Sequence, residues 1–560
     1  MGAATGWTVP GFALGTGTRF RVSAGAIARQ HTSFTCPMGL ALDARFRAGS
    51  LRPDDPSARP RFDRSASLIF AVQRAVGALA AGTDPRDIVD GERDLTHSQR
   101  RYLRHALDVL PDLIPEASRA AGAPYRPAES IAGRVPLGTL HGTVTVFAMH
   151  LTGPGAAGAV HEAVRIRLSG LREPTAEDAV WVAVAAVALA TDDAVGEDAR
   201  IRVSEFSALD GQLRCSFDGS RSDAIDALRR HGTVLWEALG GSVFRPGSAC
   251  VGCAFLSACP AVESRSGLLG VPKGVVRRRV SAADLASYSR CPTVFRVRDD
   301  HLPARYSDIA DLDFGGPQRR GLAVHAWLAW AHARQPARAC TPEDLPSPGS
   351  ATAIAAAAEA GLDPDDCALA YPYLAQHPAH CLVGHPELGG WAPERPVVSY
   401  DPHADAVVIS TPDLVAAAAD SGEPVWRETK TAATVPPDLF AAMRRYPDLA
   451  LNLVLLADRA DQTGLRGDAE LEVLTPGGGT VLAASTDQTD IVALARDLVT
   501  RIAGSLVTDT VFDRDPGPGC PTCPAHGWCD PPEDRVHFGG VPVPPGGDPT
   551  GDEAADDAPF

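Results

Sequence analysis

The cysteines of this chain fall into a pattern that occurs twice, and this repeat constrains the fold more than any other feature. Three cysteines spaced C-x2-C-x5-C stand near the middle of the chain, and three more with the same spacing stand near its end. The two sets are Cys250, Cys253 and Cys259, and Cys520, Cys523 and Cys529. A loop containing Pro and Gly precedes each set. A repeated unit of this kind predicts two domains built on one plan.

A lone cysteine far upstream accompanies each set. Cys36 stands 214 residues before the first set, Cys291 stands 229 residues before the second, and Pro follows both. Segments between them also recur in order: AVQRAVGALAAG resembles AVHAWLAWAHAR, and EDAVWVAVAAVALA resembles PDLALNLVLLADRA. Chance repetition of one cysteine set is plausible, but repetition of the whole order is much less so.

The length of the chain agrees with a division into domains. A chain of 560 residues is too long for one hydrophobic core. We expect two homologous domains, over 1–265 and 281–530, joined by a linker over 266–280. The remaining residues, 531–560, read as a disordered acidic tail rich in Pro and Gly.

The repeated cysteines have the number and spacing of metal ligands. Three cysteines in one loop and a fourth from elsewhere suit either a 4Fe–4S cluster or zinc. Zinc sites are usually built from two short-spaced pairs, so we favour two clusters and keep zinc as the alternative. Free buried thiols are the weaker interpretation. The other cysteines, Cys215, Cys340, Cys367 and Cys381, lack ligand spacing and read as ordinary buried thiols.

Charge and hydropathy exclude some classes of protein. The net charge of −17 argues against a protein that coats nucleic acid non-specifically, although a local basic groove remains possible. Apolar runs are shorter than a membrane span, and the first residues lack the basic and apolar regions of a signal peptide. We therefore expect no membrane contact and a cytoplasmic location.

Candidate catalytic residues lie between Cys291 and the second cysteine set. The segment ADAVVISTPDLVAAA reads as a strand with Asp413 at a turn, and VWRETKTAA reads as the next strand. Glu428 and Lys430 share a face of that strand because they are two residues apart. Paired carboxylates suit Mg²⁺ or Mn²⁺, and a lysine beside them can orient water. His325, in an expected helix, could add a ligand, although a single Glu-x-Lys or a lone His is usually structural.

The order of these motifs resembles the RecB-like branch of the PD-(D/E)XK nucleases, in particular members with a 4Fe–4S cluster such as the CRISPR-associated and AddB-type nucleases. The resemblance covers roughly 281–530. It assigns the metal to His325, Asp413 and Glu428, water positioning to Lys430, and the cluster to Cys291 and the second cysteine set. Glu394 matches a supporting glutamate.

One motif departs from the family. The helix after the lysine strand usually carries Q-x-x-x-Y, and here Asp448 and Asn452 have that spacing. Because this helix often contacts nucleic acid in the family, the departure bears on substrate preference more than on catalysis.

The resemblance implies a fold and an activity. The fold class is α/β, with tandem restriction-endonuclease-like domains, each a central mixed sheet flanked by helices. The activity is Mg²⁺- or Mn²⁺-dependent hydrolysis of DNA, with exonuclease action and single-stranded DNA as the first expectation. A helicase or another protein partner would fit such an enzyme. Repair, recombination and defence remain open, as does RNA as substrate.

The first domain lacks the same catalytic residues. Gln73 stands where His325 stands, Met149 or His150 falls near the place of Asp413, and the next strand offers Arg165 and Arg167 in place of Glu-x-Lys. Arginines do not bind Mg²⁺, although they can contact phosphate. We expect an inactive domain that keeps its cluster, Cys36 with Cys250, Cys253 and Cys259. A solvated arginine face is the alternative.

Two other functions compete with the nuclease. A non-catalytic nucleic-acid-binding scaffold within a larger complex would explain the acidic charge, the inactive first half and the altered helix. A redox or sensor protein would explain two clusters, but nothing near the cysteines indicates an electron partner. The Asp, Glu-x-Lys and His residues favour the nuclease over both.

Overall fold

The structure is a computed structural model of the full chain. It describes residues 19–29, 35–47, 65–86, 95–128, 132–137, 140–155, 158–231, 243–303, 315–517, 520, 523 and 525–529. The tail expected over 531–560 lies outside these residues. The fold divides into two compact units. The first unit comprises 1–263, 293–305 and 511–530, and the second comprises 264–292, 306–510 and 531–560.

The second unit is built around two mixed sheets. The larger has the order β11-β14-β15-β16-β17 and the smaller has the order β10-β13-β12-β9. The larger sheet comprises β11 (Leu388–Pro393), β14 (Leu414–Ala418), β15 (Pro424–Thr431), β16 (Asp468–Thr475) and β17 (Gly478–Ser485). The smaller comprises β9 (Glu263–Ser264), β10 (Arg278–Ser281), β12 (Val397–Asp401) and β13 (Ala406–Ser410). β15 is central and almost wholly buried, as a strand covered on both faces must be.

The first unit also contains two sheets. The larger has the order β2-β5-β6-β7-β8 and the smaller has the order β1-β4-β3. The larger comprises β2 (Arg126–Pro127), β5 (Met149–Gly155), β6 (Gly158–Arg167), β7 (Arg200–Ser207) and β8 (Leu213–Gly219). The smaller comprises β1 (Arg19–Ser23), β3 (Ala132–Leu137) and β4 (Leu140–Thr145).

The strands of the two units agree in order and direction. In each larger sheet the third and fourth strands, β6 with β7 and β15 with β16, pair in parallel, and the other neighbours pair antiparallel. In the smaller sheets β1 runs parallel to β4 and β10 runs parallel to β13. A helix connects each parallel pair of the larger sheets, as such a crossover requires. The two units therefore share one strand topology.

Helices flank both larger sheets. The first unit contains α1 (Ala24–Ala28), α2 (Pro37–Arg47), α3 (Ser65–Ala80), α5 (His97–Val109), η2 (Leu110–Asp112), α6 (Leu113–Ala121), α7 (Ala176–Ala190), α8 (Arg221–Arg230), η3 (Ser248–Gly252), η4 (Leu256–Ala258), most of α11 (Pro292–Asp299) and η8 (His526–Trp528). The second contains α10 (Ala282–Arg290), α12 (Gly315–His332), η5 (Pro342–Asp344), α13 (Ala351–Glu359), α14 (Pro364–Leu374), η6 (His377–Ala379), α15 (Leu439–Arg445), α16 (Pro447–Thr463) and α17 (Thr489–Thr508). The expected α/β class, with mixed sheets flanked by helices, is confirmed.

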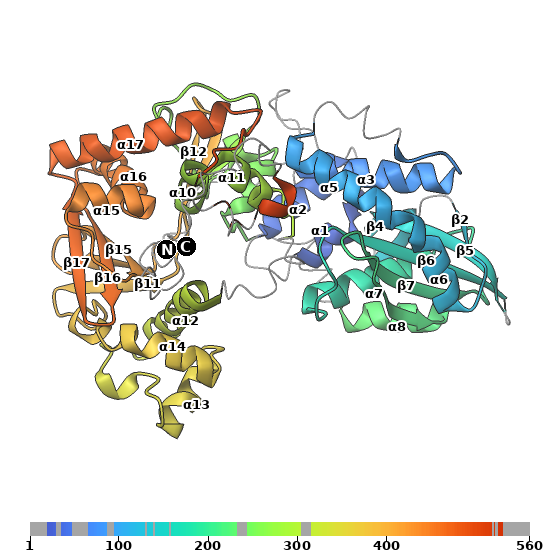
Figure 1. The fold of residues 1–560 in the computed structure, drawn as a ribbon, viewed down its shortest axis with the longest axis horizontal. Coiled ribbons are helices and arrows are strands. Elements are labelled where there is room, and N and C mark those ends of the chain that lie inside the picture. Colours follow the sequence, from blue (N-terminus) through green and yellow to red (C-terminus); the bar gives the residue numbers. More distant parts are fainter. Residues whose placement is uncertain are drawn as a thin grey trace, which may run out of the picture. The chain divides into compact units, whose positions relative to one another are not determined.

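The crossover helices form the cores. α7 is buried along most of its length in the first unit, and α16 is buried from Leu449 to Ala457 in the second. Figure 1 shows α16 and α17 on one side of the larger sheet of the second unit, with α12 and α14 on the other. The active-site candidates come from α12 and from the strands between these layers.

Local sequence signals set the helix ends. Thr175 and Asp178 form a reciprocal capping box at the start of α7, and Ser281 and Asp284 form one at the start of α10. α16 begins with Pro447 at its first position and ends at Gly464 in the left-handed conformation. No helix in the described parts of the chain is both long and apolar enough to cross a membrane.

The segment expected to be a linker, 266–280, belongs to the packed structure of the second unit. Leu269 and Val271 are buried, and β10 begins at Arg278. The main-chain N–H groups of Gly267 and Leu269 donate to the carboxylate of Asp401, both at 2.9 Å. Its apolar residues explain this difference from the expectation, since they bury area in the core rather than facing solvent.

Candidate active site and cysteine loops

Asp413 is the centre of the candidate active site in the second unit. It directly precedes β14, and the residue is 7% exposed. One carboxylate oxygen lies 2.8 Å from Nδ1 of His325 on α12, and the other accepts the main-chain N–H of Thr429 in β15 at 2.6 Å. This pair of contacts fixes the carboxylate between a helix and the central strand. The structure thus brings together two of the predicted site residues that are 88 residues apart in sequence.

Glu428 and Lys430 flank Thr429 on β15 and point to the same side. Lys430 Nζ donates to Glu428 Oε1 at 2.6 Å, and Nζ also lies 3.6 Å from Asp448 Oδ1. Glu428 and Lys430 are 5% and 8% exposed, so their charges interact with little screening by water. The strand alternation expected from the sequence therefore gives a buried ion pair rather than a solvated face.

Glu394 joins Asp413 through both backbone and side chain. It follows β11 with a φ of 49°, a left-handed conformation that is uncommon for a residue with a side chain. Its main-chain N–H donates to the carbonyl of Asp413 at 3.2 Å. Ligand atoms of His325, Glu394 and Asp413 all lie within 4.8 Å of one another. The three candidate metal ligands that lie close together therefore include Glu394, whereas the sequence had suggested Glu428 as the third.

The helix that departs from the family motif contributes to this site. Asp448 stands in the first turn of α16 and faces Lys430, as its 3.6 Å contact shows. Asn452, one turn later, is buried and bonds to the hydroxyl of Ser410. Asp448 was singled out from the sequence as part of a substrate-contacting motif, but its position is that of a partner for the lysine.

The pKa shifts of these groups follow from burial and from the surplus of carboxylates. Burial raises the pKa of Glu428 well above its ordinary value, and Asp413 raises it further. Burial and Asp413 also raise the pKa of Glu394 to about 7. Burial acts to lower the pKa of His325, but Asp413 outweighs it and the pKa is raised. The pKa of Lys430 is also raised, because nearby carboxylates outweigh the effect of burial.

This donor set fits a hard divalent cation. Carboxylate oxygens are the ligands that Mg²⁺ and Mn²⁺ prefer, and Asp413 and Glu394 supply them beside His325. Glu428 adds a carboxyl group that is an electrostatic neighbour of Asp413. Burial and the neighbouring Asp413 raise the pKa of Glu394 and of Glu428, so the negative charge of these carboxylates is costly without a cation. A divalent cation would reduce that cost.

Among the residues that the structure describes, the equivalent place in the first unit holds no such set. Asp413 directly precedes Leu414, which pairs with Arg427 on the neighbouring strand. In the first unit, Ala148 directly precedes Met149, which pairs with Val164 on the neighbouring strand. Ala148 therefore occupies the place of Asp413, whereas the sequence had suggested Met149 or His150 nearby. The same register matches Arg165 with Glu428 and Arg167 with Lys430.

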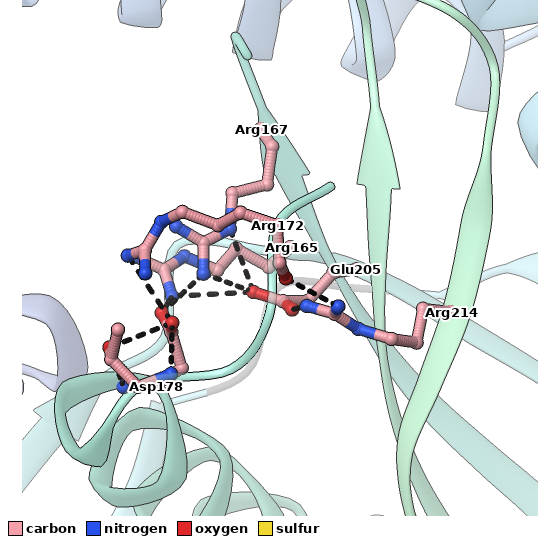
Figure 2. Close-up of polar contacts among 7 residues, drawn as sticks. Arg165, Arg167, Arg172, Asp178, Glu205 and Arg214 are labelled. Atoms are coloured by element: carbon pink, nitrogen blue, oxygen red, sulfur yellow. Dashed lines mark hydrogen bonds and ion pairs between the residues drawn. The ribbon is translucent and has the colours of Figure 1, made fainter. Parts of the chain in front are cut away.

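These arginines belong to an ion-pair cluster that Figure 2 shows at the start of α7. Arg167 Nε donates to Glu205 at 2.8 Å, Arg167 also pairs with Asp178, and Arg165 lies 3.2 Å from Asp178. Arg172 and Arg214 add to the cluster, through Asp178 and Glu205 respectively. Four guanidinium groups thus surround two carboxylates. The alternative of a solvated arginine face does not describe this arrangement, because Arg165 and Arg167 are mostly buried and paired.

The two cysteine loops have the same backbone hydrogen bonds. Gly247 N–H donates to Cys250 Sγ at 3.5 Å, and Gly517 N–H donates to Cys520 Sγ at 3.2 Å. The next cysteine of each set donates its N–H to the carbonyl of the first, at 3.2 Å in both loops. A short 3-10 helix, η4 or η8, then leads to the third cysteine. Upstream, α2 follows Cys36 and α11 follows Cys291, each beginning with Pro.

The four cysteines of the first unit are electrostatic neighbours. Burial, with smaller contributions from Cys250, Cys259 and Cys36, raises the pKa of Cys253 to about 12.

Sequence reasoning missed a second group of candidate ligands. His332, Cys340, His377 and Cys381 lie together in the second unit, although the two cysteines were expected to be ordinary thiols. The spacing H-x3-C of His377 and Cys381 was the available signal, but the other two residues lie far from it in sequence. Of the remaining cysteines, Cys367 is buried as expected, whereas Cys215 is exposed because it lies on the edge strand β8.

The comparisons with known proteins agree with this site. Residues 279–530 match the family model described as the PD-(D/E)XK nuclease superfamily, and that range contains every residue of the candidate active site. No curated protein matches the chain significantly. Residues 279–530 therefore carry a domain of the PD-(D/E)XK nuclease superfamily.

Proposed function

We propose that the protein is a Mg²⁺- or Mn²⁺-dependent deoxyribonuclease of the RecB-like type that acts as an exonuclease. The observation that carries the proposal is the position of Asp413. Its carboxylate contacts His325 on α12 and the backbone of β15 between Glu428 and Lys430. This arrangement joins metal ligands to a buried ammonium group within one small site, as hydrolysis of a phosphodiester requires.

Each side chain has a defined task in this proposal. Asp413, Glu428 and Glu394 hold the divalent cation, with His325 beside them. The cation supplies Lewis-acid stabilisation of the charge that develops on the phosphate. Lys430 stays protonated, because its carboxylate neighbours raise its pKa. Its Nζ donates hydrogen bonds that orient the attacking water and offset negative charge. Asp448 and Glu428 fix the position of Nζ from two sides.

We further propose that the cysteines hold two 4Fe–4S clusters. The first would use Cys36 with the set at 250–259, and the second would use Cys291 with the set at 520–529. The matching backbone hydrogen bonds of the two loops support equivalent roles. Each cluster would close a loop of more than 200 residues, which in principle restrains the unfolded chain by roughly a few kcal/mol.

The first unit is proposed to be an inactive copy of the nuclease domain. Its strand topology matches that of the second unit, while arginines take the places of Glu428 and Lys430. We keep 1–265 and 281–530 as the two evolutionary domains, with DNA, especially single strands, as substrate. A helicase-like partner and a cytoplasmic location belong to the same proposal.

The test compares the wild-type protein, purified without oxygen, with Asp413→Asn. Labelled single- and double-stranded DNA would be incubated with Mg²⁺ or Mn²⁺ and the product lengths measured. Asp420→Asn is the matched control, since Asp420 is an exposed aspartate in the turn after β14. The proposal predicts cleavage by wild type and control, and loss of cleavage in Asp413→Asn with visible absorbance retained. If none of the three cuts any substrate while the iron is intact, the non-catalytic scaffold is the better interpretation.

A further inference from the structure

Four side chains outside the active site converge in the second unit. His332 ends α12, Cys340 follows in a loop, His377 stands in η6, and Cys381 comes just after it. Their ligand atoms all lie within 4.8 Å of one another. His332 Nε2 is 3.1 Å from His377 Nε2 and 3.8 Å from Cys381 Sγ. Two imidazoles and two thiols thus face a common point.

These separations are those of one tetrahedral ion. Zinc with bonds of about 2.3 Å to sulfur and about 2.05 Å to nitrogen places its nitrogens about 3.4 Å apart and nitrogen and sulfur about 3.6 Å apart. The observed 3.1 Å and 3.8 Å agree with both values. A two-iron cluster with the same ligand types would put histidines and cysteines on different irons. The short distance between Cys381 and His332 favours a single ion instead.

The surroundings orient the ligands. His377 Nδ1 lies 2.9 Å from Glu472 Oε1, an arrangement that leaves Nε2 facing the common point. Cys381 Sγ accepts the main-chain N–H of Cys340 at 3.5 Å, and a guanidinium nitrogen of Arg334 lies 3.8 Å from Cys340 Sγ. Carboxylate–histidine pairs and N–H groups directed at sulfur are the outer contacts that metal ligands commonly receive.

The site is largely shielded from solvent, since three of its four side chains are buried and Cys381 is partly exposed. His332, Cys340 and His377 are 6%, 3% and 1% exposed. Four protein ligands complete a tetrahedron, so no position remains for water or substrate, which is the property of a structural zinc site. Two thiolates also balance the charge of Zn²⁺, which lowers the cost of burying the ion.

We propose that His332, Cys340, His377 and Cys381 bind one structural Zn²⁺ ion. The ion links the C-terminal end of α12 to the segment that follows α14. Through Glu472 it also reaches the central strands, because Glu472 Oε2 accepts the hydroxyl of Thr429 at 3.0 Å. His325 and His332 lie seven residues apart on α12, hence on one helix face. The ion therefore fixes the helix that presents His325 to Asp413.

Metal analysis of the full-length protein, purified without oxygen and dialysed against a chelator, tests the proposal. We expect one zinc per chain in wild type, in addition to iron. X-ray absorption at the zinc edge should show two sulfur ligands at about 2.3 Å and two nitrogen ligands at about 2.0–2.1 Å. Cys381→Ser should lose zinc and keep iron. The matched control is Cys367→Ala, which alters a buried cysteine of the same helical region outside the site and should keep both metals.

Three results would overturn the proposal, and each can be read on wild type without relying on a folded variant. The first is iron-replete protein that contains no zinc. The second is zinc with an all-sulfur shell, which would place it in the cysteine loops, or with an oxygen-rich shell, which would place it in the active site. The third is a mass 2 Da below that of the reduced chain with a Cys340–Cys381 disulfide in the peptide map.

Discussion

Replacing Lys430 with methionine should change DNA cleavage and metal binding in opposite directions. Lys430 Nζ lies 2.6 Å from Glu428 and 3.6 Å from Asp448, and burial limits screening by water. Methionine keeps most of the side-chain volume and removes only the charge and the donor. The variant therefore isolates the electrostatic role of the ammonium group from packing.

The magnitudes follow from these contacts. Loss of one donor that stabilises charge in a transition state typically lowers the rate by about 10²–10³, or about 2.7–4 kcal/mol. Breaking a buried ion pair by removing one partner costs about 3–5 kcal/mol. A divalent cation that binds the released carboxylates recovers part of that cost. Recovery of about 1.4 kcal/mol would tighten Mn²⁺ binding about tenfold.

The assay combines cleavage of labelled DNA with titration of Mn²⁺, by calorimetry or electron paramagnetic resonance, on protein purified without oxygen. Lys273→Met is the matched control, since Lys273 is exposed and is the only other lysine in the chain. If Lys430→Met binds Mn²⁺ more weakly than wild type, or keeps more than about a tenth of the activity, the role given to the ammonium group is wrong.

Three further predictions use other parts of the structure. Asp178→Ala should destabilise the first unit by roughly 2–4 kcal/mol in denaturant unfolding, because it removes one half of the capping box of α7 and takes a carboxylate partner from Arg165, Arg167 and Arg172. Burial acts to raise the pKa of Asp178, but hydrogen bonds from Thr175 and Arg167 lower it to about 2. The contribution of Asp178 to the stability of the first unit should therefore be full above the ordinary aspartate pKa and disappear as the pH falls through about 2. The affinity for Mn²⁺ should rise as the pH increases through about 7, because Glu394, whose pKa burial and Asp413 raise to about 7, must lose its proton to bind metal. In the metal-free protein the same group should lower stability as the pH rises from its unfolded pKa to about 7. Trp528→Ala should cost about 3–5 kcal/mol and promote iron loss from the second cysteine loop, measured by visible absorbance, since Trp528 is fully buried against Tyr102.

The sequence was informative where chemistry is local. Glu428 and Lys430 share a face because strand side chains alternate, and Asp413 reaches them because it directly precedes the neighbouring strand. The cysteine loops are also local: the recurrence of their spacing predicted two domains built on one plan, and the two loops have matching backbone hydrogen bonds. In each case a few residues and one periodicity determine the outcome.

Tertiary contacts produce the features of the site that could not be predicted from the sequence. Asp448 faces Lys430 because the first turn of α16 ends beside β15, which depends on how the crossover helix packs. His332, Cys340 and the pair at 377–381 meet because α12 and α14 pack on the same side of the larger sheet. Their separations along the chain match no compact motif, so only the fold brings them together.

The contrast between the two units shows how one strand position can serve different chemistry. The chain contains two lysines, and one of them is Lys430, whereas the matching strand of the first unit has Arg165 and Arg167. A guanidinium is a planar fork that binds carboxylates on two sides, and Arg167 does so with Asp178 and Glu205. An ammonium group is compact, so Lys430 can balance Glu428 while leaving carboxylate oxygens open to a cation. The use of lysine rather than arginine at position 430 is therefore explained by the cation that we propose the second site also binds.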